Sequence, residues 1–251
     1  MGDACQGCIT LPFRASDDDD KDALNDLIDN CTGHPSVQPD TDGDGIGNAC
    51  DARVGKDTRF CTWTFRPTVA GEDAAIWTSS WLLGSSFEIR DSQIQHQSSM
   101  TLDVATLRSA TFDAAAGVAF DTRLHITSYT PPMVLGVGFE LQTAVANLYT
   151  CQVVKAAAGS NPVLQLVGDG VVLDSLSVPT TLPLQVSTYV LVSAIRIMDG
   201  VRVNCAMDID GIGGGSLMTT IPDQLIKLRP RLVADRVTVD FDHVSVYKLG
   251  I

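Results

Sequence analysis

Glutamate is nearly absent from this sequence. Of its 30 acidic residues only Glu72, Glu88 and Glu140 are glutamates, so almost all of the negative charge is carried by aspartate. Aspartate has a short side chain that suits turns and ion-binding loops, and it is depleted in strands and disfavoured inside helices. Together with the frequent Val, Thr, Ser and Gly, this composition points away from a helical protein.

Basic residues are also few, and long apolar runs are missing. The formal net charge of -13 excludes nucleic acid and an anionic membrane surface as the main partner, because both would repel the chain. No run of about 18 apolar residues is present, so no membrane span is expected. With 45% apolar residues over 251 positions, the chain is long enough for one large domain, or for a domain with an appendage.

Of the seven cysteines, those in residues 1–59 are not expected to be free thiols buried in a core. Residues 1–59 contain 13 Asp against 5 Lys and Arg, and this stretch offers no core in which a thiol is buried. Disulfide bonds are expected there, which indicates an oxidising compartment. No signal peptide opens the sequence, so we expect the natural amino terminus to have been removed. The odd number leaves one thiol free or one partner missing, and no partner is assigned to Cys5, Cys8 or Cys61.

The character of the sequence changes near residue 60, which predicts two parts, residues 1–59 and residues 60–251. The second part consists of short β-type runs such as "CTWTF", "VLGVGFEL" and "LYTCQVV", separated by turn signals such as "GSNP", "GDG" and "MDG". Helical periodicity is confined to a possible short turn around Met100–Arg108. Many short strands without intervening helices predict an all-β fold, a jelly-roll β-sandwich.

The stretch Asp40–Asp51, "DTDGDGIGNACD", has the spacing of a calcium loop. Ca²⁺ takes six to eight oxygen ligands, and the known twelve-residue solution supplies them from positions 1, 3, 5, 7, 9 and 12, with Gly at position 6. Gly45 occupies position 6, and Asp replaces the usual Glu at position 12. The predicted ligands are Asp40, Asp42, Asp44, the carbonyl of Ile46, Asn48 and Asp51.

A second copy of the pattern lies upstream, at Asp18–Asp29. It has Ala23 where the turn requires Gly, which argues against a positive φ angle there. A disordered acidic linker, and a cleavage tag at "DDDDK", are the alternative interpretations, but two copies in register favour an ion-binding repeat. The predicted ligands of this copy are Asp18, Asp20, Asp22, the carbonyl of Leu24, Asp26 and Asp29.

Residues 17–51 resemble a thrombospondin type 3 repeat, because "DNC" at Asp29–Cys31 is followed by a spacer with two prolines and then by "DTDGDGIGNACD". The resemblance implies that aspartates of both copies wrap calcium ions and that Cys31 and Cys50 form a disulfide bond. Ca²⁺ affinity is expected to be weak, about 10⁻⁴ to 10⁻³ M as in extracellular modules. Folding of this segment should depend on the ion, since little else offsets its chain entropy.

Residues 61–251 resemble, at the level of pattern, a concanavalin A-like or laminin G-like jelly roll. The closing stretch "VTVDFDHVSVYKLG" alternates Val237, Val239 and Phe241 inward against polar residues outward. "TYVLVSAIRIMDGVRVNCAMDIDG" predicts a hairpin with its turn at Asp199–Gly200. Cys151 and Cys205 both lie mid-strand, and the sequence leaves open whether they bridge neighbouring strands or are buried apolar side chains.

No catalytic signature accompanies these features. Retaining glycosidases need two carboxylates about 5–5.5 Å apart, typically in an ExDxxE strand, and the three glutamates form no such motif. His243 beside Asp240 and Asp242 is interpreted as a solvated strand face rather than a site. "DIDGIGGG", Asp208–Gly215, is interpreted as a hairpin rather than a second calcium loop. The tryptophans Trp63, Trp77 and Trp81 are expected in the core, with sugar stacking as the alternative.

These observations predict a secreted or cell-surface calcium-binding protein for adhesion or recognition, and not an enzyme. In this interpretation the repeat is a stiff spacer, and the β-sandwich binds a glycan or a cell-surface protein. The alternatives are a saccharide-acting enzyme on the same fold, or a purely structural component of a surface or matrix. The sequence does not name the ligand of the sandwich.

Overall fold

The alternating sequence after residue 57 forms strands throughout the described part of the chain. The computed structural model describes residues 22–24, 28–31, 39–48, 58–63, 81–82, 85–90, 93–98, 100–107, 112–113, 117–141, 147–178, 182, 184, 186–198, 200–209, 213–222 and 227–248. Every regular element in these residues is a β-strand, as the composition predicted. The first strand begins at Thr58, close to the predicted boundary at residue 60.

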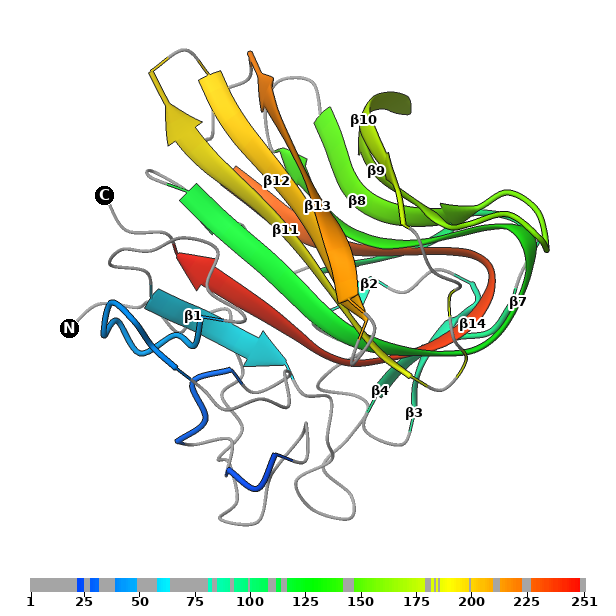
Figure 1. Ribbon diagram of the computed structural model, residues 1–251, viewed down its shortest axis with the longest axis horizontal. Helices are drawn as coiled ribbons and strands as arrows, with labels where there is room; N and C mark the ends of the chain where they lie inside the picture. Colours follow the sequence, from blue (N-terminus) through cyan, green and yellow to red (C-terminus); the bar gives the residue numbers. More distant parts are fainter. Residues whose placement is uncertain are drawn as a thin grey trace.

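Two unusually long strands organise the molecule. β7 (Gly117–Leu141) and β14 (Lys227–Lys248) pair antiparallel along most of their length, from Val118 opposite Lys248 to Leu141 opposite Leu228. Figure 1 shows both strands, green and orange to red, curving round one end of the molecule so that each passes from one layer of the fold into the other. All fourteen strands therefore belong to one hydrogen-bonded sheet that is folded over on itself.

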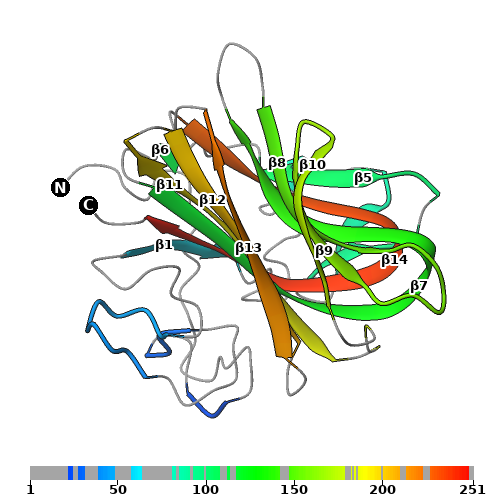
Figure 2. The same cartoon turned by 45° about the horizontal axis from the view of Figure 1, so that its top comes forward.

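The folded sheet has two layers, which Figure 2 shows from a second side. In the first layer the amino-terminal half of β7 and the carboxy-terminal half of β14 lie in the middle. The other strands of the first layer are β11 (Ser187–Ile197), β12 (Gly200–Ile209) and β13 (Gly213–Ile221) on one side, and β1 (Thr58–Trp63), β4 (Gln93–His96) and β3 (Phe87–Arg90) on the other. The second layer is built from the other halves of β7 and β14. Its other strands are β8 (Asn147–Lys155), β9 (Val163–Gly168) and β10 (Val171–Ser177) on one side, and β5 (Asp103–Leu107), β6 (Phe112–Asp113) and β2 (Trp81–Leu82) on the other.

The two bends that join the layers lie next to each other. β7 turns at Pro131–Pro132, where the peptide bond is cis, and β14 turns at Arg236, whose φ of 54° lies in the left-handed region. Arg236 Nη1 donates a hydrogen bond of 3.1 Å to the carbonyl oxygen of Pro132. This bond links the bend of one long strand to the bend of the other.

The core lies between the layers and is filled by the inward residues of each strand. Phe120, Phe139 and Phe241 are its largest fully buried side chains, and the rings of Phe120 and Phe139 lie 6.2 Å apart. Burial alternates with a period of two along β9 and β12, as expected for strands with one face in a core. A core filled from the inward faces of two layers supports the sandwich interpretation of residues 61–251.

A disulfide bond crosses this core. Cys151 of β8 and Cys205 of β12 are bonded, with their Cα atoms 5.1 Å apart, and both side chains are fully buried. β8 belongs to the second layer and β12 to the first, so the bond joins facing layers. The sequence left open whether these cysteines form a bridge or are separate buried side chains, and the bridge is present. It joins facing layers, and not the neighbouring strands that the bridge interpretation assumed.

The closing strand confirms the predicted alternation and explains its irregularity. Val237, Val239 and Phe241 point inward and are fully buried. The next of the predicted inward residues is Val244, three positions later, because the register shifts between Phe241 and His243 and places Asp242 in a bulge. The extra residue restores the inward direction for Val244 and Val246.

Both predicted hairpins are present, and one predicted turn is not. β11 and β12 pair from Ile197 opposite Gly200 outward, and β12 and β13 pair from Ile209 opposite Gly213, so Asp208–Gly215 belongs to a hairpin. The possible helical turn around Met100–Arg108 is wrong, since Asp103–Leu107 forms β5 and pairs with β14. Cross-strand pairing overrides the weak local periodicity there.

A histidine lies in the core beside the closing strand. The ring centroids of His96 and Phe87 lie 4.7 Å apart, and His96 Nδ1 lies 2.7 Å from the carbonyl oxygen of Val237. Nδ1 therefore carries the proton, and the buried Nε2 has no hydrogen-bond partner. Burial lowers the pKa of His96 below its usual 6.5 and outweighs the hydrogen bond to Val237 and the charges of Asp103 and Asp235, which raise it.

This buried histidine predicts acid sensitivity of the sandwich. The unfolded chain takes up a proton at His96 near pH 6.5, whereas the folded chain does so only at lower pH, so its contribution is complete above pH 6.5. Below that pH the free energy of unfolding should fall by up to about 1.4 kcal/mol per pH unit for this one proton. Urea titrations between pH 7.5 and 5 check the slope, and His96→Phe should reduce it. An equal slope in that variant would contradict the assignment to His96.

Candidate functional site

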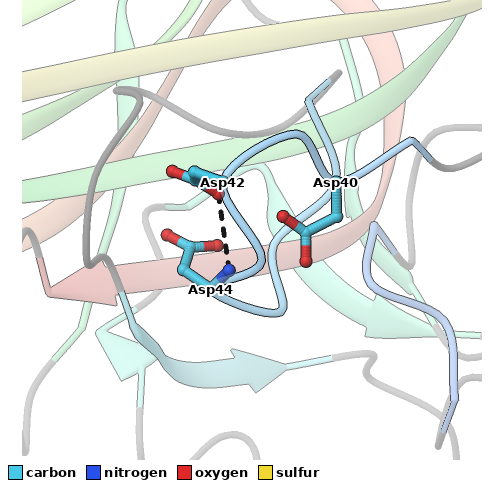
Figure 3. A group of neighbouring side chains, drawn as sticks. All are labelled: Asp40, Asp42 and Asp44. Carbon is cyan, nitrogen blue, oxygen red and sulfur yellow. Dashed lines mark hydrogen bonds between the residues drawn. The ribbon is translucent and has the colours of Figure 1, made fainter.

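The acidic loop Pro39–Asn48 brings three predicted ligands together. Carboxylate oxygens of Asp40, Asp42 and Asp44 all lie within 4.8 Å of one another. Figure 3 shows the three side chains around one turn of the loop. Among the residues that the structure describes, this is the one group of acidic, histidine or cysteine side chains close enough to share a metal ion.

The loop takes this shape because two glycines adopt backbone angles that other residues avoid. Gly43 and Gly45 have φ angles of 75° and 91°. Their amide groups both donate to Asp40, at 2.7 Å to Oδ1 and 2.9 Å to Oδ2. The glycine predicted at position 6 therefore makes the turn that aims the backbone at the first aspartate.

The remaining aspartates of the loop are held by the chain that follows them. Asp42 Oδ1 accepts from the amide of Asp44 at 3.4 Å, and Asp44 Oδ1 accepts from the amide of Ile46 at 2.9 Å. A carboxylate oxygen has two lone pairs, so accepting one of these bonds does not prevent it from binding a cation. Oxygens bound to one Ca²⁺ at 2.3–2.6 Å are at most about 5 Å apart, and three carboxylate oxygens within 4.8 Å of one another fit such an ion.

Asn48, the predicted ligand at position 9, closes the loop back on its start. Its Oδ1 accepts from the amide of Thr41 at 3.0 Å, and its Nδ2 donates to Thr41 Oγ1 at 2.7 Å. Its own amide donates to the carbonyl of Pro39 at 2.8 Å. Asp51, predicted at position 12, lies outside the described residues.

The upstream copy is described only in part. Asp22 Oδ1 accepts from the amide of Leu24 at 2.8 Å, and Asp29 Oδ1 accepts from the amide of Cys31 at 2.5 Å. Ala23 has a φ of 75°, so the sequence-based doubt about this turn was wrong. The left-handed turn forms even though alanine pays a steric cost of about 1–2 kcal/mol there. The predicted ligands Asp18, Asp20 and Asp26 lie outside the described residues.

The two copies contact each other and also contact the sandwich. The amide of Gly47 donates to the carbonyl of Asn30 at 2.9 Å, which joins the second copy to the end of the first. Cys31 and Ile46 are 1% and 2% exposed and form one apolar cluster with Ala119, Leu191 and Tyr247 of the sandwich. The expectation that this segment has no core was therefore wrong at these two residues. Cys31 is disulfide-bonded, and its predicted partner Cys50 lies outside the described residues.

The members of this cluster that belong to the sandwich lie on the outer face of the first layer. Ala119 and Leu191 alternate with the core residues Val118, Phe120, Val190 and Val192, and Ala119 lies opposite Tyr247 in the pairing of β7 with β14. Both views place the described part of the repeat, in blue, on the side of the molecule that carries β1 and the end of β14. We call Ala119, Leu191 and Tyr247 the docking patch.

A charged group lies farther along the same face. Asp242, in its bulge, lies 3.0 Å from His125 Nδ1 and 3.8 Å from Arg123 Nε, and it accepts a hydrogen bond of 2.5 Å from Gln93 Nε2. Asp240 lies directly opposite His125 in the pairing of the strands. The sequence analysis considered only His243 beside these aspartates and interpreted them as a solvated strand face. It missed Arg123 and His125. Asp240 and Asp242 meet Arg123 and His125 only through the register of β7 against β14. No local sequence motif indicates this pairing.

The structure does not describe the side chains of the remaining tryptophans and cysteines that the sequence singled out. Trp77 lies outside the described residues, and Trp63 and Trp81 are placed only as residues of β1 and β2. Cys61 likewise is placed in β1, while Cys5 and Cys8 lie outside the described residues. The expectations about tryptophan burial and about these three cysteines therefore stay predictions.

The two-layered sheet has clear counterparts among solved structures. The CBM2 module of evolved Dit from Lactobacillus casei BL23 phage J-1 has a TM-score of 0.56 at 11% identity, covering 78% of this chain and 97% of the module. A seed lectin of Lotus tetragonolobus has a TM-score of 0.55 at 10% identity, covering 76% of this chain and 98% of the lectin. The fold is a concanavalin A-like jelly roll. The potassium-bound carbohydrate recognition domain of Emp46p adds a TM-score of 0.54 at 8% identity, covering 76% of this chain and 97% of that domain.

Similarity to this chain is found in structure and not in sequence. No family model matches the chain, and no curated protein sequence matches it. The resemblance of residues 17–51 to a thrombospondin type 3 repeat therefore stays a prediction. At identities of 8–11% the solved structures show the shared fold alone.

Proposed function

We propose that this protein is a secreted or cell-surface calcium-binding recognition protein whose jelly roll binds a glycan or a cell-surface protein. The observation that carries the calcium part is the convergence of Asp40, Asp42 and Asp44 to within 4.8 Å on a loop turned by two glycines. These residues, with the carbonyl of Ile46, Asn48 and Asp51, would hold the ion, which supplies charge neutralisation and a fixed loop shape.

The recognition part is supported by the kind of protein that shares the fold. The similar solved structures include a seed lectin and a carbohydrate recognition domain, and the latter is described in a potassium-bound form. Fold likeness alone does not carry function across such low identity. The partly exposed polar group around Asp242 offers carboxylate, amide and imidazole groups to hydroxyl-rich ligands.

The location is supported by the sulfur chemistry. Cys151 and Cys205 form one disulfide, and Cys31 belongs to another. Disulfides persist in oxidising compartments and are rare in the reducing cytosol. The described part of the chain has no helix of sufficient length and apolarity to cross a membrane.

Calcium binding is tested directly by titration calorimetry. We expect Ca²⁺ to bind with a Kd of about 10⁻⁴ to 10⁻³ M. The double variant Asp42→Asn, Asp44→Asn removes two charges from the loop and should have a Kd at least about tenfold higher. Asp174→Asn, on β10 far along the chain from the loop, is the matched control and should bind as the unmodified protein does. Chelation with EDTA should loosen residues 15–55 while the main melt of the jelly roll persists. Absence of any calcium effect in calorimetry and circular dichroism would refute the ion-binding role.

Glycan recognition is tested on a glycan array with and without Ca²⁺. Retention of a defined glycan class supports the proposal, and retention that vanishes with EDTA assigns the ion a part in it. The second candidate, a saccharide-acting enzyme, is favoured only by the cluster of Asp240, Asp242 and His125. Polysaccharide turnover that disappears in Asp240→Asn or Asp242→Asn would establish it. Inactivity in both assays would leave a structural surface or matrix role.

A further inference from the structure

One residue belongs both to the acidic loop and to the contact with the jelly roll. The amide of Ile46 donates to Asp44 Oδ1 at 2.9 Å, and Asp44 is one of the three converging carboxylates. The side chain of the same Ile46 is 2% exposed and packs in the cluster formed with the docking patch. Any change in the backbone of Ile46 must therefore alter the loop and the contact together.

The docking patch has no part in the core of the jelly roll. Its residues point away from the space between the layers, and their inward neighbours on β7 and β11 fill that space instead. Leu191 is 8% exposed with the repeat in place. Without the repeat, the apolar side chains of this cluster would be exposed to water on both sides of the contact, which is unfavourable.

We propose that the docking patch, through Ile46, is a positioning surface for the acidic loop, so that cation binding and docking of the repeat favour each other. This inference rests on the proposed calcium-binding function. An undocked loop must be gathered by the ion against chain entropy and against the mutual repulsion of three carboxylates. Docking fixes the backbone at Ile46 beforehand, so less of the binding free energy is spent on ordering the loop.

Linkage makes the effect reciprocal. If docking raises the affinity of the loop for its cation by some factor, cation binding raises the tendency to dock by the same factor. Burial of one large aliphatic side chain changes an equilibrium constant by on the order of tenfold or more. A residue of the jelly roll that offers no ligand atom should therefore influence the Kd of a loop about 150 residues away in the sequence.

The decisive variant is Leu191→Ala, assayed by calorimetric titration of the whole chain with CaCl₂. We expect the Kd to rise about three- to tenfold while the melting of the jelly roll changes little, because Leu191 lies outside its core. Leu173→Ala is the matched control, since Leu173 is a 40% exposed leucine on the edge strand β10. It should leave the Kd unchanged.

The possible results separate this inference from the proposed function. An unchanged Kd in Leu191→Ala would overturn the coupling and leave calcium binding intact. No Ca²⁺ uptake by the unmodified chain would overturn calcium binding and, with it, the coupling. An equal rise of the Kd in both leucine variants would also overturn the coupling, because the effect would not come from the docking patch.

A second measurement does not depend on a substitution in the jelly roll. Tyr247 is 3% exposed beneath the repeat, whereas Tyr149 is 5% exposed and belongs to the core. With tetranitromethane, we expect nitration of Tyr247 to rise severalfold on adding EDTA, and to be high with or without Ca²⁺ in Ile46→Ala. Tyr149 serves as the internal control and should remain protected in every case. Equal protection of Tyr247 with Ca²⁺ and with EDTA would contradict the coupling.

Discussion

Replacing Cys151 and Cys205 together by alanine is expected to lower the free energy of unfolding by about 4 kcal/mol. The bond closes a loop between residues 54 positions apart, and its loss restores the corresponding freedom to the unfolded chain. It also removes the cross-link between β8 and β12 of the facing layers, leaving two small apolar side chains in the core. The expected effect is a large share of the 5–15 kcal/mol that typically stabilises a domain.

Urea unfolding at equilibrium measures this effect and identifies its cause. Removal of a cross-link lets the unfolded chain expand, so the dependence of the unfolding free energy on urea concentration should become steeper. A cavity in the core would lower the midpoint without changing that slope. An unchanged midpoint in the double variant would show that the disulfide does not stabilise the fold.

Gly200→Ala is expected to destabilise the jelly roll by about 3 kcal/mol or more. Two independent costs add at this position. The φ of Gly200 is 144°, a conformation that residues with a Cβ rarely adopt. A Cβ there would also overlap the carbonyl oxygen of Ile221 on the neighbouring strand β13, a backbone atom that cannot rotate away.

Gly159→Ala is the matched control for that substitution. A Cβ at Gly159 meets no atom within 4 Å, and the residue lies in an exposed turn between β8 and β9. Chemical denaturation of both variants should therefore separate them by most of the predicted difference. Equal stability of the two variants would mean that the hairpin at Gly200 relaxes without cost.

The parts of the fold that were predictable are those encoded by neighbouring residues. The alternation from Val237 onward gives the inward face of the closing strand, and the turn residue Gly200 gives the hairpin of β11 and β12. The acidic loop is equally local, because the predicted ligands that the structure describes lie within nine residues, Asp40 to Asn48. In each case the pattern and the contact lie in the same short stretch.

The unpredicted parts depend on contacts between distant residues. The first half of β7 was missed because Asp121, Arg123 and His125 interrupt its apolar pattern, although they lie on the outer face and leave the core intact. Cys151 and Cys205 face each other only because the sheet folds over on itself. The spacing of residues along the chain does not indicate this folding. The cluster that Ile46 forms with the docking patch depends on the same long-range geometry.

The folded sheet also constrains how far this protein can fold while it is being synthesised. β14 lies in the middle of both layers and pairs with β7 after on the order of a hundred intervening residues. At typical rates of translation, about 5–20 residues per second, β7 waits several seconds for its partner. During that interval β7 presents one unpaired edge in each layer to the surroundings. A nascent chain halted before Lys227 should therefore bind chaperones and resist folding, even though most of its strands have already been synthesised.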